Sequence, residues 1–185
     1  MILGRTDESI SIMKELVKRD PYSVEFLQDL TRMYLYAGQF TEAIPVANKS
    51  LELEPNNSSS VRHLGDAYLF SGDAEKAMKH HTQLWGIDST YAPQGYIGAL
   101  VRLGRKDEAR KKFSSVKNSI TIAKKAMCFI HLNEIDSALK CLDTAYQVKD
   151  GYLPFIRIEP HLKLLSGEPR YEALVQKMNF PSATK

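Results

Sequence analysis

The sequence has few of the features that indicate a disulfide-stabilised, membrane-spanning or nucleic-acid-binding protein. Its 185 residues include two cysteines and one tryptophan, and the chain has a net charge of +3. Cys128 and Cys141 lie 13 positions apart. Because a chain of this size needs no disulfide, we expect two reduced thiols in a reducing cytoplasm. No apolar run approaches the ~18 residues of a membrane helix. The small charge indicates neither a nucleic acid nor a membrane as partner.

Motifs that would indicate an enzyme are also missing. The chain contains no HExxH, no GxSxG, no Walker loop and no paired CxxC. His80 and His81 are adjacent, so on a helix their side chains would point about 100° apart and could not both bind the same metal ion. His81 is expected in the core, whereas His63 and His131 are expected to be more exposed and have no partners at metal-ligand spacing. We therefore predict no enzymatic activity, no metal and no cofactor.

What the sequence does contain is a repeated phrase. Residues 36–44 read YAGQFTEAI, and 34 residues later, residues 70–78 read FSGDAEKAM. The phrase marks a series with spacings of 34, 34, 32 and 29, made by Gly4, Gly38, Gly72, Gly104 and Asn133. Asparagine, like glycine, tolerates a left-handed turn conformation. Five positions after each member stands a small residue, namely Ser9, Ala43, Ala77, Ala109 and Ala138.

The residues on either side of each glycine have helical spacing. Leu27, Leu30 and Tyr34 precede Gly38 at intervals of three and four, and Ala43 begins a similar series after it. Such intervals place apolar side chains on one face of a helix. Each unit is therefore expected to be a helix, a tight turn and a second helix, and the fold to be all-α.

These patterns resemble a known repeat family. The string DLTRMYLYAGQFTEAIPVANKSLELEPNN resembles a tetratricopeptide repeat, a helix hairpin of 34 residues, and RHLGDAYLFSGDAEKAM is a closer match. Val61, His81 and Ser89 stand where the family has Trp, Phe and Pro. The resemblance implies a right-handed superhelix of antiparallel helix hairpins, an α-solenoid. We expect the array over residues 1–148, with a half unit at 1–23 and units at 24–57, 58–89, 90–118 and 119–148.

The remaining residues, 149–185, are expected to form a helical cap. Proline suits the first position of a helix, so Glu159-Pro160 and Glu168-Pro169 predict helices near 160–166 and 169–179, with a break at Gly167. The last helix should dock on the exposed edge of the last repeat. The final ~50 residues also resemble the ends of repeat regions that follow bacterial class III nucleotide cyclases and transcription regulators. That resemblance implies the regulatory part of a larger bacterial signalling protein.

The start of the chain matches only the second helix of a unit. Ile10, Met13, Leu16 and Val17 would then form a bare apolar edge. One explanation is that the chain is a piece of a longer protein cut within a repeat. The alternative is a natural start that caps itself or self-associates through this edge.

The resemblance implies that the first helix of each unit lines a concave groove in which partners bind. Nine groove residues are predicted as a binding site: Gln28, Arg32, Tyr36, Arg62, Asp66, Phe70, Gln94, Arg102 and His131. Aromatic rings beside arginines suit an extended acidic and apolar peptide. Two alternatives stay open, that the rings pack between units and that the arginines are solvated. Gly95 and Gly98 leave room for close backbone packing or a ligand.

We therefore expect a non-catalytic scaffold that binds a protein or peptide in its groove. The alternative function is a regulatory domain that senses a small molecule, with the ligand in a groove closed by the tail around residues 152–158.

Overall fold

The computed structural model describes residues 6–180, and every regular element in this range is a helix. One helix, α1 (Thr6–Arg19), precedes four antiparallel pairs. The pairs are α2 (Val24–Ala37) with α3 (Phe40–Leu53), α4 (Ser58–Ser71) with α5 (Ala74–Ile87), α6 (Pro93–Arg102) with α7 (Lys106–Val116), and α8 (Ile122–His131) with α9 (Ile135–Gln147). Three short elements follow, η1 (Leu153–Phe155), α10 (Pro160–Lys163) and α11 (Pro169–Lys177). The predicted all-α superhelix of hairpins is confirmed.

The tight turns fall where the repeated phrase predicts them. Gly38, Gly72 and Gly104 have φ angles of 77°, 98° and 77°, and Asn133 has 60°. This left-handed region is strained for most residues but open to glycine and tolerated by asparagine. Gly4, the first member of the series, lies outside the described residues.

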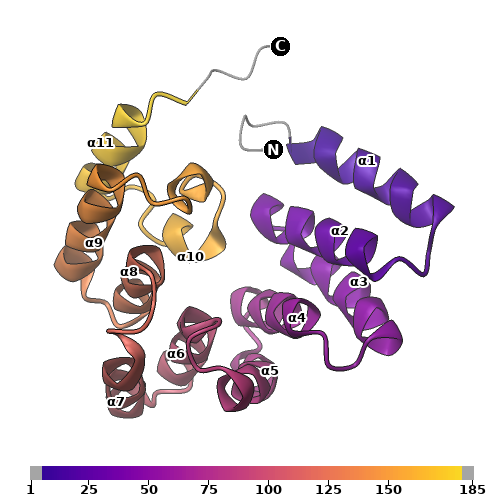
Figure 1. The fold of residues 1–185 in the computed structure, drawn as a ribbon, viewed down its shortest axis with the longest axis horizontal. Coiled ribbons are helices and arrows are strands. Elements are labelled where there is room, and N and C mark those ends of the chain that lie inside the picture. Colours follow the sequence, from indigo (N-terminus) through magenta and orange to yellow (C-terminus); the bar gives the residue numbers. More distant parts are fainter. Residues whose placement is uncertain (1–5, 181–185) are drawn as a thin grey trace.

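Small residues allow the helices of the array to pack closely. Ala43, Ala77, Ala109 and Ala138, each five positions after a turn residue, are fully buried. Consecutive helices contact one another from α1 to α7, α6 contacts α8, and α8 contacts α9, so the pairs build a curved stack. In Figure 1 the stack forms an arc with α1 and α11 at its open ends.

The cap has the two predicted helices and the predicted break, since Gly167 has a φ angle of 88°. As expected, α11 packs against α9, and Leu153, Ile156 and Tyr171 join the hydrophobic core of the last pair. The cap also does something that the sequence did not predict. Its short helix α10 contacts α8 and lies inside the arc (Figure 1).

The expected bare apolar edge of α1 is wrong for the residues named. Ile10 is buried, and Met13 and Val17 pack against the core that α2 and α3 supply, with Leu16 partly buried. They face inward because α1 stacks on α2. The exposed apolar side chain of α1 is Ile12, with 55% of its surface accessible. Self-association through this edge stays a prediction.

Glycines in the middle of helices make room for histidine rings. A Cβ atom on Gly95 would lie 2.1 Å from Cε1 of His81, and one on Gly65 would lie 2.8 Å from Nε2 of the same ring. A Cβ atom on Gly98 would lie 2.8 Å from Cε1 of His131. Gly95 and Gly98 were expected to admit a backbone or a ligand, and they admit these two side chains instead.

The Gly95→Ala substitution should therefore destabilise the fold. The His81 ring is fully buried and cannot move away, so overpacking should cost about 1–3 kcal/mol despite the better helix propensity of alanine. The matched control is Gly86→Ala in α5, where nothing lies within 4 Å of the added methyl group. Urea denaturation should show a loss of stability for Gly95→Ala and no loss for Gly86→Ala. Equal stability of the two variants would contradict the packing described.

Candidate functional site

The concave surface is occupied by the chain itself. Residues 152–165, here called the internal segment, pass from the last pair into the arc. Within this segment Glu159, Pro160, His161 and Leu162 are all buried. The groove predicted for a partner is thus lined and filled by residues of one chain.

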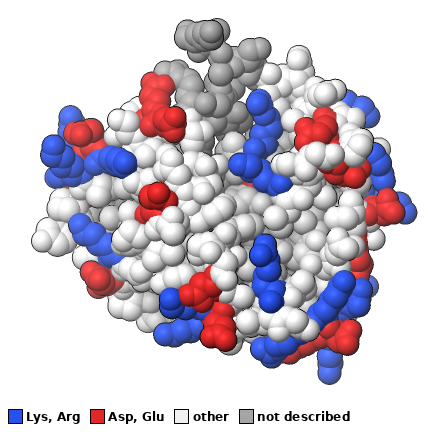
Figure 2. Space-filling view, turned by 180° about the vertical axis from the view of Figure 1, so that it is seen from behind, with Lys and Arg blue, Asp and Glu red and all other residues white. Residues whose placement is uncertain are grey.

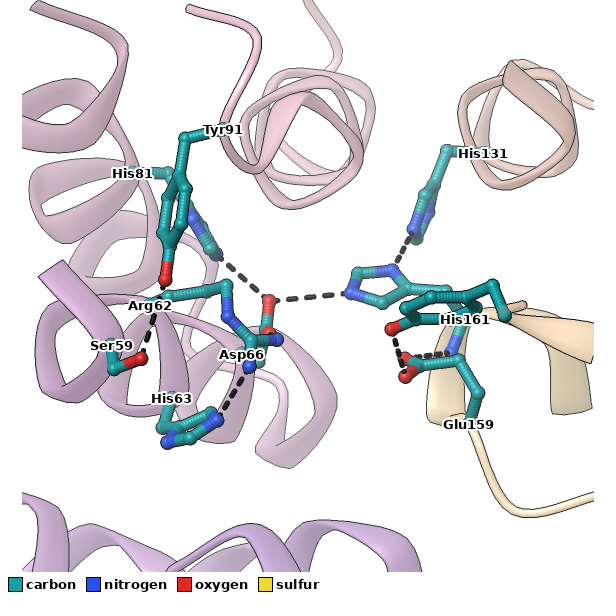
Figure 3. A network of polar contacts seen from close by, with 10 residues as sticks. Ser59, Arg62, His63, Asp66, His81, Tyr91, His131, Glu159 and His161 are labelled. Atoms are coloured by element: carbon teal, nitrogen blue, oxygen red, sulfur yellow. Dashed lines mark hydrogen bonds and ion pairs between the residues drawn. The ribbon is translucent and has the colours of Figure 1, made fainter. Parts of the chain in front are cut away.

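The deepest polar contact of the segment is made by His161, which is 1% exposed. Its Nε2 atom lies 3.3 Å from Oδ1 of Asp66 on α4, and its Nδ1 atom lies 2.7 Å from Nε2 of His131 on α8 (Figure 3). The edge of its ring meets the face of Phe70, with ring centroids 4.8 Å apart. One side chain therefore connects the second and fourth pairs of the array across the groove.

The contact with Asp66 fixes one proton of His161. A carboxylate only accepts hydrogen bonds, so Nε2 of His161 donates to Asp66. Nδ1 of His161 and Nε2 of His131 share one hydrogen bond, and the tautomers of the two rings decide which of them donates. Burial lowers the pKa of His131 well below its usual value, and the neighbouring His161 lowers it further. His131 is therefore neutral.

Asp66 is the anionic centre of the cluster. The same oxygen that accepts from His161 lies 3.3 Å from Nε2 of His81, and the other oxygen lies 3.4 Å from Nη1 of Arg62. Burial alone would raise the pKa of Asp66, but its contacts with His161 and His81 hold that pKa well below its ordinary value. Asp66 is thus a buried carboxylate that stays ionised because donors surround it.

Arg62 also contacts His63, with its Nη2 atom 2.5 Å from Nε2 of that ring. A guanidinium only donates, so Nε2 of His63 accepts. Burial, and then the charge of Arg62, lower the pKa of His63 well below its usual value. The expectation that His63 and His131 are more exposed is wrong: they are 4% and 8% exposed. The internal segment covers His131, while α2 and α4 lie close together around His63.

The internal segment also buries a carboxylate. Glu159 is 3% exposed, and the hydroxyl group of Tyr152 donates to its Oε2 atom at 2.8 Å. Burial, and then the charge of Glu159, raise the pKa of Tyr36 to about 12. Arg62 acts on the same tyrosine in the opposite direction. Glu159 and Arg62 thus shift the pKa of Tyr36 in opposite directions, as charges of opposite sign close to one hydroxyl group do.

The two predicted aromatic residues contact the segment as well. Phe70 stacks on Phe40 of the preceding pair at 5.3 Å between ring centroids and also meets His161. The ring centroid of Tyr36 lies 6.1 Å from that of Phe155 in the internal segment. Packing between units and packing against an occupant of the groove therefore occur together at Phe70.

The structure brings six of the nine predicted site residues together around the internal segment, namely Arg32, Tyr36, Arg62, Asp66, Phe70 and His131. Arg32 also pairs with Asp29 at 2.6 Å. Of the other three, Gln94 is buried, Arg102 is exposed and Gln28 is partly buried. Sequence reasoning placed the tail around residues 152–158 at the groove only in the alternative of a small-molecule sensor, and it missed Glu159 and His161. The Glu-Pro pair was a signal, but it indicated only the start of a helix.

Little space is left inside the groove. The gap between Glu159, Arg32 and Arg62 has a volume of about 10 Å³, which suits no more than a water molecule. Two larger cavities lie at the rim. One of about 300 Å³ is lined by residues that include Thr6, Asp7, Tyr36, Arg157 and Lys163. An apolar one of about 250 Å³ is lined by residues that include Leu35, Phe40, Phe70, Pro160 and Leu164.

In the described part of the chain, the surface charge, the hydropathy of the helices and the arrangement of possible metal ligands indicate no second site. Acidic and basic side chains are interspersed over the face drawn in Figure 2, without a broad field of one sign. Among residues 6–180, no helix combines the length and the hydropathy needed to cross a bilayer. The same residues hold no cluster of three or more His, Cys, Asp or Glu side chains arranged to bind a metal ion.

Comparisons with known proteins give the architecture and little more. No family model matches the chain. A solved structure, that of MamA protein, is similar with a TM-score of 0.56 and 21% identity, over 82% of this chain and 87% of that one. The general transcriptional corepressor trfA of Dictyostelium discoideum is 22% identical over 118 residues. That match spans 62% of this chain but only 8% of the corepressor. The likeness to MamA shows the fold.

Two buried histidines should make stability depend on pH. The folded pKa values of His63 and His131 lie below the unfolded value of ~6.5, so the unfolded chain binds protons first as the pH falls. Stability is thus complete above the unfolded pKa and declines below it, by at most about 2 kcal/mol for each histidine between pH 7 and pH 5. Urea denaturation at both pH values measures this loss. In His63→Gln and His131→Gln variants the loss should shrink by about half, and equal stability at pH 7 and pH 5 would contradict the assignment.

Proposed function

We propose that the chain is a non-catalytic interaction scaffold that holds a peptide segment of a partner protein on its concave surface. The observation that carries this proposal is that the surface already holds a short, largely irregular segment, residues 152–165. Six of the residues predicted to bind a partner contact it or line its pocket. The groove therefore has the shape and the polar groups to hold a peptide of this kind.

Binding a partner there requires the internal segment to leave. A tethered segment competes at an effective concentration in the millimolar range, so a weak partner would be excluded. The segment connects to α9 through Lys149 and Asp150, where Lys149 has a φ angle of 55°. No regular element lies between α9 and η1. In this proposal, release moves residues 149–165 and withdraws Leu153, Ile156, Leu162 and Leu165 from the core of the last pair. Among the described residues, the cores of the other pairs contain no residue of this segment and stay packed.

The larger context is part of the same proposal. The resemblance of the tail to the ends of repeat regions in bacterial cyclases and regulators supports a regulatory part of a larger signalling protein. The similarity to a stretch of a transcriptional corepressor supports a role in bringing proteins together. Its cytoplasmic location rests on the two free cysteines, Cys128 and Cys141.

A small-molecule sensor is the second candidate, and the rim cavity favours it. That cavity of about 300 Å³ includes Arg157 and Lys163 among its lining residues, which suits an anionic compound. The interior of the groove has no comparable space while the internal segment occupies it.

A displayed library of random peptides tests the principal proposal. We expect enrichment on the full-length His161→Ala variant, because loss of this ring weakens the internal segment by one aromatic contact and two hydrogen bonds. Enriched peptides should bind this variant at least tenfold more tightly than the wild type, measured by fluorescence anisotropy. Adding Arg62→Glu to the variant should abolish binding, because it reverses the charge in the groove.

Lys111→Glu on α7 is the matched control for this charge reversal, since the residue is exposed and lies far from the internal segment. Peptide binding that survives Arg62→Glu would place the site elsewhere. If no peptide is enriched, and one metabolite raises the melting temperature of the wild type in a saturable way, the sensor is correct instead.

A further inference from the structure

The occupant of the groove shows which chemistry the groove accepts. We propose that it recognises a partner segment in which an acidic side chain precedes a proline and a hydrogen-bonding ring follows it, the order of Glu159, Pro160 and His161. This inference rests on the proposed function and goes further, since it names the class of partner. Each of the three positions meets a different requirement of the groove.

The first position requires an anion. Burial of a carboxylate is costly unless a cation or hydrogen-bond donors compensate it. The carboxylate of Glu159 accepts a hydrogen bond from the hydroxyl group of Tyr152. Glu159 also lines one small gap together with Arg32 and Arg62. Arg32 and Arg62 each pair with one carboxylate of the array, Asp29 and Asp66. An acidic occupant adds a second carboxylate to the gap that these two arginines line.

The second position requires a residue without a backbone N–H group. Pro160 is buried and lines both the gap beside Arg62 and the apolar rim cavity with Phe40 and Phe70. At the first position of a helix the ring has a suitable φ angle, and no donor is left unpaired. The next side chain, that of His161, points toward Asp66 and His131, as Figure 3 shows.

The third position requires a ring with a hydrogen-bonding nitrogen atom on each side. Asp66 offers only acceptors, and Nε2 of His131 is the second hydrogen-bond partner. Phe70 contributes a flat face that suits the edge of an aromatic ring. A phenyl ring would fit the space but would leave Asp66 and His131 without these partners, which is costly in a buried site.

The test uses a fluorescently labelled synthetic peptide with the sequence of residues 152–166, titrated onto the full-length His161→Ala variant. We expect saturable binding to the variant, at least tenfold tighter than to the wild type, in which the tethered segment fills the groove. Replacing the histidine of the peptide by phenylalanine, or its glutamate by glutamine, should each weaken binding at least tenfold. A peptide with alanine in place of the exposed Ser166 is the control and should bind unchanged.

Circular dichroism shows whether the variant is folded, and His161→Asn replaces it if the alanine variant is not. Equal binding of all four peptides would overturn the recognition rule. If the same variant enriches library peptides of another pattern that Arg62→Glu abolishes, the rule is wrong while the proposed function stands. If neither the probe peptide nor any library peptide binds, both are wrong.

Discussion

The centre of the molecule depends on one buried negative charge. Asp66 lies inside the arc, where an unpaired carboxylate would be strongly unfavourable, and it is held by groups from several elements. His81 comes from α5, Arg62 from α4 itself, and His161 from the internal segment. The last of these is supplied from 95 residues further along the chain. The position of the C-terminal residues is therefore tied to the electrostatics of the second pair.

This constraint also explains features that would otherwise look unrelated. The histidine rings fit between the helices because glycines face them, Gly95 and Gly65 toward His81 and Gly98 toward His131. The helices of three successive pairs thus pack around polar rings as well as around apolar side chains such as Leu69 and Leu100. The result is a groove whose floor is both rigid and polar, which is an arrangement that can discriminate among the segments it holds.

The fold could be predicted from the sequence because its signals are local. Gly38, Gly72 and Asn133 mark turns, and Ala43 and Ala77 mark the close approach of neighbouring helices. The groove residues followed from the resemblance to a repeat family. What occupies the groove could not be predicted, because the contact of His161 with Asp66 has no periodicity and no local pattern. The tail was expected to cap the last repeat, and its apolar residues do so, but its buried polar residues turn inward.

A double-mutant cycle between Asp66 and His161 tests the central claim most directly. Asp66→Asn, His161→Gln and the double variant would each be unfolded with urea at pH 7, and the three losses of stability compared. If the two side chains interact in the groove, the coupling energy should be about 1 kcal/mol or more. Losses that add to within about 0.5 kcal/mol would show that the two residues act independently, and the account of a self-occupied groove would be wrong.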